Sequence, residues 1–262
     1  MLSGLLILPF CGRPSVVMAE VRSHWRVIFR VALFQTFLLY GLFFWGMTYV
    51  PGALAAIIIG ASPLFSGLVA HMLMPGDQMN QQKWVSIGLA IAGVVLIAFH
   101  KDPFSRNGFS QAIGILLLVS SSVMSAIGNV LVSKAHSDLR PAVLSGAQIF
   151  LGGLMLFILS LLVEPLPTFQ YPVLFYGAFF YLSAMSAVAF SMWFYLLKQP
   201  GVKVSELNLW KFIIPVFGAA LSWFILPNES PNWISVAGMV CVGSAIFFYF
   251  STSSRNLNQQ QE

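Results

Sequence analysis

A basic side chain inside a long apolar segment is the feature of this sequence that points most directly to chemistry. Lys211 lies within the apolar run 204–226, and a charged group in a membrane span costs a few kcal/mol unless it faces a polar cavity or reaches the interface. Two interpretations stay open: the ammonium attracts a carboxylate or phosphate of a substrate, or it extends along the helix into water. Glu206 lies five positions earlier, about 140° away around a helix, so it is not an i,i+4 partner of Lys211. We expect an interfacial role for Glu206 at a helix N-terminus, with proton coupling as the alternative.

Amide and aromatic side chains in other apolar runs could line the same cavity. Four amides fall in the cytoplasmic half of their runs under the topology derived below: Gln35, Asn129, Gln148 and Asn208. They predict a polar vestibule open to the cytoplasm, where a substrate would be collected. The alternatives are amides tolerated near an interface and amides that hydrogen-bond between helices. Four aromatic residues are candidate cavity walls, or residues that face lipid and the interfacial belt: Trp45, Tyr49, Tyr181 and Trp193.

The sequence offers no ligand set for a metal and no pair of groups for acid–base catalysis. His71 and His100 lie near the ends of apolar runs, far from any cluster, whereas a metal site needs several convergent ligands. Cys11 and Cys241 are far apart, which argues against a disulfide framework. Fingerprints for dinucleotides, for nucleotide phosphates and for zinc proteases are missing as well. We therefore expect no metal, no cofactor and no enzymatic activity.

The composition identifies the class of protein in which these residues must be positioned. Of 262 residues, 58% are hydrophobic and only 8% are charged, whereas a soluble domain needs about a quarter of its residues charged. A water-soluble protein is therefore excluded. The net charge of +5 does not indicate nucleic acid, because the basic residues stand singly or in small groups between apolar segments. That arrangement is typical of charges that orient a membrane protein.

Eight apolar segments predict membrane-spanning helices, each approaching or exceeding the roughly 20 residues that cross a bilayer. The predicted spans are 31–50, 54–74, 84–99, 110–133, 142–163, 173–197, 204–226 and 233–250. Residues 2–10 are also apolar but number only nine, so we interpret them as the second half of a span whose first half is missing. The most polar break in the middle of the chain, 100–108, separates a first half at 1–99 from a second at 108–251. We expect residues 252–262 to form a disordered cytoplasmic tail.

The two halves contain the same motif. Three residues of the first half recur 152 positions later, and two glycines that follow recur 150 positions later; the pairs are Pro63–Pro215, Pro75–Pro227, Asp77–Glu229, Gly88–Gly238 and Gly93–Gly243. Such coincidences at a nearly constant offset indicate an internal duplication. Pro63 and Pro215 interrupt equivalent apolar runs, where the missing backbone N–H of proline predicts a helix kink.

The basic residues predict that the halves cross the membrane in opposite directions. If segment 12–30 is cytoplasmic and the chain crosses alternately thereafter, ten of the basic residues are cytoplasmic and only Lys101 and Arg106 are on the opposite side. The ten are Arg13, Arg22, Arg26, Arg30, Lys83, Lys134, Arg140, Lys198, Lys203 and Arg255. Under this topology 54–99 enters from outside and 204–250 from the cytoplasm. Inverted repeats of this kind are the architecture of many secondary transporters.

At these residues the chain resembles the EamA-type ten-helix exporters of the drug/metabolite transporter superfamily. The resemblance covers nearly the whole chain and rests on YVPGALAAIIIGASPLFSGLVA with its PGD turn and GLAIAGVVLI, and on NLWKFIIPVFGAALSWFILPNE with GMVCVGSAIFF. Asp77 stands where the first repeat of that family more usually has glutamate, and Glu229 keeps the glutamate in the second. Residues 2–10 match only the end of the family's second helix. Either Met1 is an internal methionine of a longer reading frame, or the chain is truncated.

The resemblance implies an all-α polytopic bundle of two inverted EamA-type repeats, with eight full spans plus an N-terminal partial helix. It also implies alternating-access export of a small metabolite, such as an amino acid, across the bacterial inner membrane, coupled to protons or by exchange. The partners would be the lipid bilayer and the metabolite, with no nucleic acid, and the C-terminus would be cytoplasmic. The alternative is a transport-inactive, truncated membrane protein with a structural or assembly role.

Overall fold

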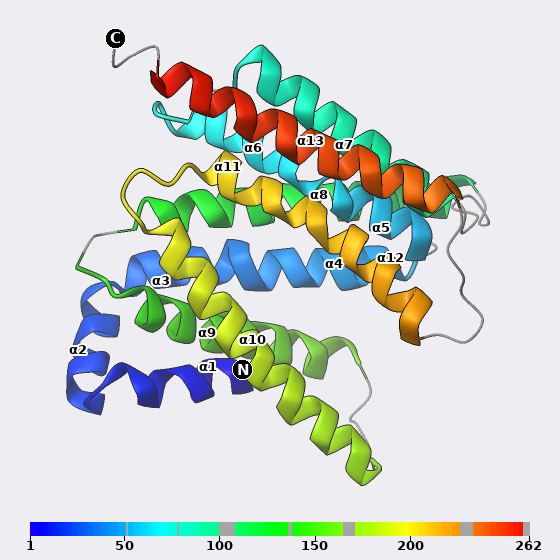
Figure 1. Ribbon diagram of the computed structural model, residues 1–262. Coiled ribbons are helices and arrows are strands. Elements are labelled where there is room, and N and C mark those ends of the chain that lie inside the picture. Colours follow the sequence, from blue (N-terminus) through cyan, green and yellow to red (C-terminus); the bar gives the residue numbers. More distant parts are fainter. Residues whose placement is uncertain are drawn as a thin grey trace. The chain divides into compact units, whose positions relative to one another are not determined.

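A computed structural model describes residues 1–50, 52–77, 79–99, 108–135, 138–164, 171–225 and 233–258. These residues are mostly helical and contain no strand, as the all-α prediction requires (Figure 1). η1 and η3 are 3₁₀-helical and η2 is π-helical. In chain order the elements are α1 (Leu2–Ile7), η1 (Leu8–Cys11), α2 (Pro14–Ser23), α3 (Trp25–Ala32), η2 (Leu33–Leu38), α4 (Leu39–Met47), α5 (Gly52–Gly60), α6 (Ser62–Leu73), α7 (Gln81–Phe99), α8 (Gly108–Ser133), α9 (Pro141–Val163), α10 (Val173–Leu197), α11 (Val204–Leu209), η3 (Trp210–Phe212), α12 (Ile213–Ile225) and α13 (Trp233–Asn258).

Prolines and one asparagine determine where several helices begin. Pro14, Pro63 and Pro141 each lie in the first turn of a helix, where a missing N–H is not needed because those donors have no partner within the helix. Asn80 precedes α7, and its side-chain oxygen accepts a hydrogen bond of 2.9 Å from the backbone N–H of Lys83. This is the N-cap arrangement, which satisfies one of the four unpaired donors at a helix start.

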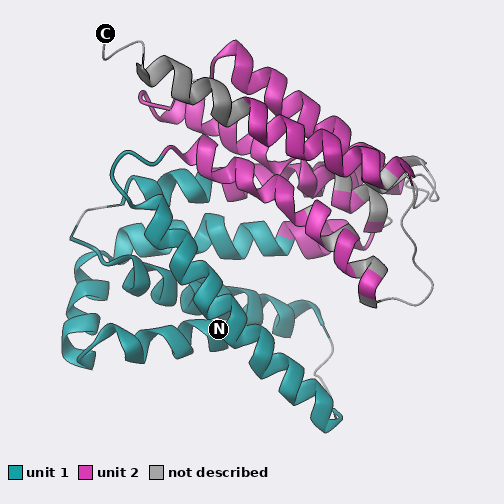
Figure 2. Cartoon of the chain, viewed as in Figure 1, with its two compact units in different colours: residues 1–41, 127–202 teal, residues 42–126, 203–262 magenta. Residues whose placement is uncertain are grey.

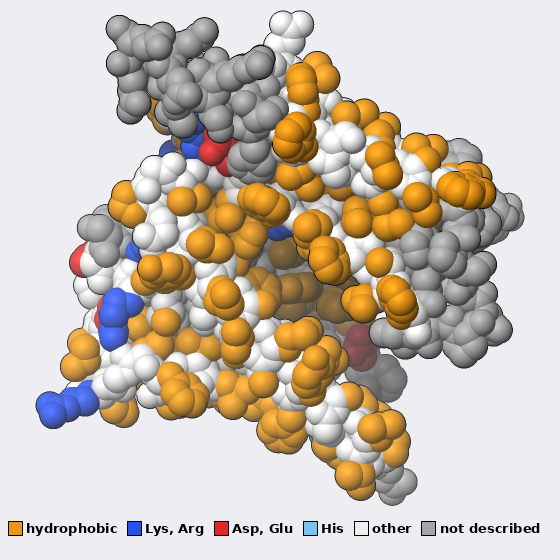
Figure 3. All heavy atoms as spheres, viewed as in Figure 1, with side chains coloured by type: hydrophobic (Ala, Val, Ile, Leu, Met, Phe, Trp, Pro, Cys, Tyr) orange, Lys and Arg blue, Asp and Glu red, His pale blue; other side chains and the backbone are white. Residues whose placement is uncertain are grey.

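Large apolar side chains cover much of the surface while several polar side chains are buried, which differs from a soluble protein. Most large apolar side chains of α10 are exposed, including the run from Phe179 to Leu182, and orange apolar atoms dominate the face drawn in Figure 3. Polar side chains such as Gln35, Asn129 and Gln148 are buried instead. A hydrocarbon solvent favours this arrangement, since apolar surface meets lipid tails and polar groups bond to each other. The protein is therefore a membrane protein.

Four helical segments within the described residues are long and apolar enough to cross a membrane: Trp25–Met47, Phe109–Ser133, Pro141–Val163 and Val173–Leu197. A fifth arises if Leu2–Cys11 and Pro14–Ser23, which are bent by 113° relative to each other, count as one span. The other predicted spans are also helical, but 54–74 is divided between α5 and α6, and 204–226 between α11, η3 and α12. The total of eight full spans stays a prediction. α13 continues to Asn258, into the segment for which a disordered tail is predicted, because helix propagation is far easier than nucleation.

The helices form two compact units, residues 1–41 with 127–202 and residues 42–126 with 203–262 (Figure 2). Each unit takes helices from both halves of the sequence, so packing does not follow the order of the predicted repeats. In unit 1, α9 is the central helix and contacts α1, α3, η2 and α10. The approach of α1 to α9 is so close that a Cβ atom on Gly4 would lie 2.5 Å from the carbonyl oxygen of Gly146. Only a glycine fits there.

In unit 2 the main packing partners are α7 and α13, which are the last helices of the two predicted repeats. The two helices run antiparallel: the Cys241 thiol lies 3.5 Å from the carbonyl oxygen of Leu89, and a Cβ atom on Gly93 would lie 2.7 Å from the carbonyl oxygen of Gly238. The direction of α13 relative to α7 is the one that inverted repeats require. Around the contact lies an apolar cluster of Ile87, Ala90, Leu209, Phe212, Val242 and Ala245.

Candidate functional site

Two helices of unit 2 are interrupted at equivalent places in the predicted repeats. α5 ends at Gly60 and α6 starts at Ser62, with Ala61 in a turn between them and Pro63 buried in the first turn of α6. In the second repeat α11 ends at Leu209, and the 3₁₀ turn Trp210–Phe212 separates it from α12. Both interruptions lie just before a proline, Pro63 or Pro215, whose ring nitrogen cannot donate to the carbonyl four residues earlier. The side chain of Pro215 lies outside the described side chains.

Lys211 lies in the 3₁₀ turn of the second interruption and is half-buried. Its neighbours Leu209 and Phe212 are fully buried in the apolar cluster of unit 2. One turn earlier, the buried amide of Asn208 donates a hydrogen bond of 2.8 Å to the carbonyl oxygen of Val204. The interruption therefore carries an ammonium group and an amide within a single helical turn of each other.

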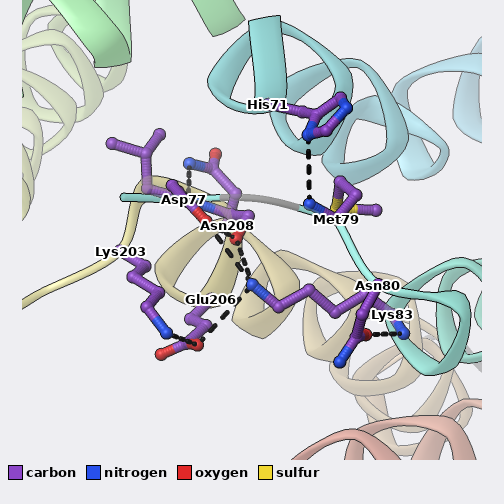
Figure 4. Close-up of polar contacts among 10 residues, drawn as sticks. His71, Asp77, Met79, Asn80, Lys83, Lys203, Glu206 and Asn208 are labelled. Atoms are coloured by element: carbon purple, nitrogen blue, oxygen red, sulfur yellow. Dashed lines mark hydrogen bonds and ion pairs between the residues drawn. The ribbon is translucent and has the colours of Figure 1, made fainter. Parts of the chain in front are cut away.

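A charged cluster in unit 2 joins the turn after α6 to the start of α11 (Figure 4). The Asp77 side chain is only 1% exposed and accepts a hydrogen bond of 2.8 Å from the backbone N–H of Ser205 and another from its hydroxyl. Lys83, at the start of α7, lies 3.5 Å from the Asp77 carboxylate and 3.8 Å from that of Glu206. Glu206 is also paired with Lys203 at 3.3 Å. We call these five residues the Asp77 cluster.

The Asp77 cluster balances two carboxylates with two ammonium groups. A buried carboxylate is tolerated only when paired and hydrogen-bonded, and Asp77 meets both conditions through Lys83 and Ser205. Glu206 likewise has two basic partners, Lys83 and Lys203. Both segments that the cluster joins are predicted to be cytoplasmic. Within unit 2, the cluster therefore connects the first predicted repeat, through Asp77 and Lys83, to the second, at the start of α11.

Unit 1 contains a second buried polar group, made of neutral side chains on η2, α8, α9 and α10. The Gln35 amide donates to the side-chain oxygen of Asn129 at 3.1 Å, and the Trp193 indole N–H donates to the same oxygen at 3.1 Å. The Thr36 hydroxyl donates to the Gln148 side-chain oxygen at 2.7 Å. We call these five residues the amide network. It links helices that are far apart in the sequence, which is one of the alternatives the sequence leaves open for these amides.

Two atoms of the amide network have no hydrogen-bond partner in the described part of the chain: Oε1 of Gln35 and Nε2 of Gln148. Leaving a buried polar atom unpaired costs about 1–3 kcal/mol. Gln35 and Thr36 also lie in the π-helical segment η2, a backbone form that is rare and frequent at functional sites. A polar ligand that reached the network would find an acceptor in Oε1 of Gln35 and a donor in Nε2 of Gln148.

The aromatic candidates are divided between the two units. Trp45 in unit 2 and Tyr181 in unit 1 are both exposed, at 58% and 68%, and Tyr49 is half-buried. Trp193 alone bonds to a candidate amide, Asn129. Among the described residues no group of three or more His, Cys, Asp or Glu side chains could hold a metal ion; His100 lies outside those residues.

Sequence reasoning missed several residues that the structure brings into these clusters. In the sequence, Asp77 is recognised only as one of the residues that recur in the second repeat, and Lys83 only as a basic residue that predicts the orientation in the membrane. Ser205 and Thr36 carried no signal, because a hydroxyl in a helix is common and its partners here lie more than a hundred residues away. The recurrence of a carboxylate in equivalent turns, at Asp77 and Glu229, is the sequence signal that could have indicated a role for Asp77.

Comparison with known proteins identifies the fold. The sequence profile of the EamA-like transporter family matches residues 1–99 and 112–251. The chain belongs to the EamA-like transporter family. It is 24% identical over 245 residues to the uncharacterized transporter YvbV of Bacillus subtilis, covering 94% of this chain and 78% of YvbV. It is 26% identical over 250 residues to the uncharacterized transporter sll0355 of Synechocystis, covering 90% and 75% of the two chains.

A third relative, protein PecM of Dickeya dadantii, is 25% identical over 202 residues, with 75% of this chain and 64% of PecM covered. A solved crystal structure with 17% sequence identity superposes with a TM-score of 0.72 and covers 95% of this chain and 87% of its own. This EamA-family protein is therefore a membrane transporter with the fold of its family.

Proposed function

We propose that this EamA-family transporter exports a small metabolite, such as an amino acid, across the inner membrane by alternating access. The observation that carries the proposal is the pair of interrupted helices, α5/α6 and α11/η3/α12, at equivalent places in two halves whose last helices run antiparallel. Discontinuous helices in corresponding positions of inverted repeats are where secondary transporters form their binding sites. Inverted halves also provide two equivalent conformations, one open to each side.

Lys211 is the residue we propose as the contact for a negatively charged group of the substrate. It lies in the interruption itself, at the N-terminal side of α12, where the partial positive charge of a helix N-terminus adds to that of the ammonium. Both favour a carboxylate or phosphate. Asn208 offers an amide within one turn of Lys211.

The proposed orientation follows the basic residues, with the C-terminus and the Asp77 cluster in the cytoplasm. Under this orientation Glu206 lies at the cytoplasmic end of α11 and is a candidate for proton coupling. The alternative is exchange of one metabolite for another.

Efflux from preloaded cells tests this function directly. Cells that express the chain are loaded with a panel of radiolabelled amino acids, and loss of label is compared with cells that carry an empty vector, with and without a protonophore. We expect faster loss of at least one amino acid. Slower loss in the presence of the protonophore would indicate proton coupling. Unchanged loss across the panel would overturn the export of amino acids and favour a structural role.

The role of Lys211 is tested in the same assay with Lys211→Met, which preserves the length and apolar stem of the side chain. Lys134→Met, which removes a lysine outside the spans, is the matched control. We expect Lys211→Met to slow efflux of the carboxylate-bearing substrate by tenfold or more, since a lost charge-assisted contact is worth about 1.5–3 kcal/mol, and the control to leave it unchanged. Equal efflux by both variants would remove Lys211 from the binding site without removing the transport activity.

A further inference from the structure

Segment 12–30 of unit 1 contains more basic side chains than it has acidic side chains paired with them. Four exposed arginines lie there: Arg13, Arg22, Arg26 and Arg30. None of the four has an ion-pair partner in the described ranges of the chain. Arg26 contacts only the ring of Trp25, at 5.7 Å from its centroid. Arg26 and Arg30 are i,i+4 neighbours on α3, where like charges repel each other.

The acidic residues that could neutralise these arginines are occupied by other bases. Glu20 binds Arg140, with a distance of 2.7 Å between the guanidinium and the carboxylate, and it also accepts the Arg140 backbone N–H at 2.6 Å. The pKa of Arg140 is raised above its ordinary value, chiefly by the hydrogen bond to Glu20. Asp138 lies 3.1 Å from the ring of His24. Glu164, the third described acid of unit 1, accepts a hydrogen bond from the Ser160 hydroxyl at the opposite end of α9 from Arg140. The surplus positive charge on segment 12–30 therefore forms no ion pair with the described acids of unit 1.

The backbone places this surplus beside exposed apolar side chains. The chain turns by 113° between α1–η1 and α2, at Gly12, whose φ of 113° is a conformation that only glycine adopts readily. α2 therefore does not continue the direction of α1, and it exposes Val16 and Met18. On α3, Trp25 and Phe29 are exposed and alternate with the arginines. Basic side chains stand at the edge of the molecule where α2 lies (Figure 3).

We propose that segment 12–30 binds the headgroup of an anionic phospholipid. Exposed aromatic and apolar side chains next to guanidinium groups match the boundary between acyl chains and phosphates. Arginine is suited to this partner because its planar fork bonds two phosphate oxygens at once. A phosphate between Arg26 and Arg30 removes their mutual repulsion. The proposal does not depend on which metabolite is transported.

Unit 2 provides an internal contrast. Its basic residues Lys83 and Lys203, which are predicted to lie on the same side of the membrane, are paired with Asp77 and Glu206. A lipid phosphate would have to compete with these carboxylates. The headgroup site is therefore assigned to the arginine segment rather than to cytoplasmic basic residues in general.

Native mass spectrometry of the purified full-length chain tests the proposal. The protein is titrated with phosphatidylglycerol, with phosphatidylcholine and with inorganic phosphate. We expect Arg26→Gln with Arg30→Gln to weaken phosphatidylglycerol binding about 25-fold, because each arginine near an anionic surface contributes about 1 kcal/mol, or roughly fivefold. Binding of phosphatidylcholine, which has no net charge, is expected to stay unchanged.

The matched control is Lys198→Gln with Lys203→Gln, which removes the same charge from lysines already engaged by the Leu139 carbonyl and by Glu206. We expect this control to bind phosphatidylglycerol within about twofold of the wild type. Equal weakening in both double variants, or none in the arginine variant, would overturn the site, as would full competition by inorganic phosphate. If the arginine double variant cannot be purified, Arg26→Gln alone is expected to weaken binding about fivefold.

Discussion

Unit 1 keeps its buried polar side chains neutral, with Gln35, Asn129 and Gln148 bonded between helices, whereas unit 2 buries the carboxylate of Asp77 against Lys83. The surface charges follow the opposite pattern. Unit 1 leaves arginines exposed on segment 12–30, whereas the partly exposed Lys203 of unit 2 is paired with Glu206.

The difference means that unit 2 depends on a buried ion pair for stability, whereas unit 1 depends on hydrogen bonds between neutral side chains. Removing one partner of a buried ion pair strongly destabilises a protein, because the remaining charge stays buried without a counter-charge. A buried amide that loses its partner costs much less, and the reference state in a membrane also offers partners. The same kind of substitution should therefore have unequal effects in the two units.

The largest expected effect is that of Lys83→Met in unit 2. Loss of the ammonium leaves the Asp77 carboxylate, which is 1% exposed, with hydrogen bonds from Ser205 but no counter-charge. We expect the free energy of unfolding in detergent to fall by about 3 kcal/mol. The measurement is reversible unfolding in mixed micelles.

The double variant Asp77→Asn with Lys83→Met is the control for this prediction, because it removes both charges together. It should recover part of the lost stability. If Lys83→Met alone changes the free energy of unfolding by less than about 0.5 kcal/mol, the Asp77 cluster does not stabilise unit 2.

A much smaller effect is expected for Gln148→Leu in unit 1. The variant loses the hydrogen bond from Thr36 but also removes the unpaired Nε2 atom. Because hydrogen bonds between membrane helices average about 0.6 kcal/mol, we expect stability to change by less than about 1 kcal/mol. The same unfolding assay measures it, and a loss as large as that of Lys83→Met would abolish the contrast between the units.

The smallest effect concerns pH and Lys198, which caps α10 and bonds to the carbonyl oxygen of Leu139. Burial lowers the pKa of Lys198 from its ordinary value of 10.5, more than Asp138 and Glu20 raise it. A lowered lysine pKa means that the charged form is disfavoured in the folded state, so this group destabilises the protein below its folded pKa. The penalty is relieved as pH rises from that pKa toward 10.5.

Unfolding of the wild type and of Lys198→Met at neutral and alkaline pH measures this contribution as a difference. We expect the wild type to gain stability relative to the variant as pH rises. A relative loss in the alkaline range would show that the Leu139 contact requires the charged lysine more than burial opposes it.

Much of the fold could be predicted because it depends on composition and periodicity. Apolar runs and the scarcity of charge identify membrane helices, and Pro63 and Pro215 lie where the structure interrupts them. The antiparallel contact of α7 with α13 agrees with the inversion inferred from basic residues alone. These properties belong to segments of 20 or so residues, over which weak signals add.

The clusters themselves could not be predicted because they depend on single contacts between distant residues. Ser205 donates a hydrogen bond to Asp77, which is 128 residues away in the sequence, and Thr36 donates one to Gln148, which is 112 residues away. No local pattern distinguishes these hydroxyls from others in the chain. The π-helical form of η2 and the 3₁₀ turn at Lys211 are likewise departures from the regular helix that propensities predict.

The inversion of the two repeats is the claim on which the proposed transport depends, and labelling of single cysteines tests it most directly. Gln78→Cys and Ser230→Cys, which are equivalent positions at the 152-residue offset, are each placed in a chain whose Cys11 and Cys241 have been replaced. A maleimide that cannot cross the membrane is applied to intact cells. We predict that the cysteine at 230 reacts in intact cells and that the cysteine at 78 reacts only after permeabilisation. Labelling of both positions from the same side would contradict inverted repeats.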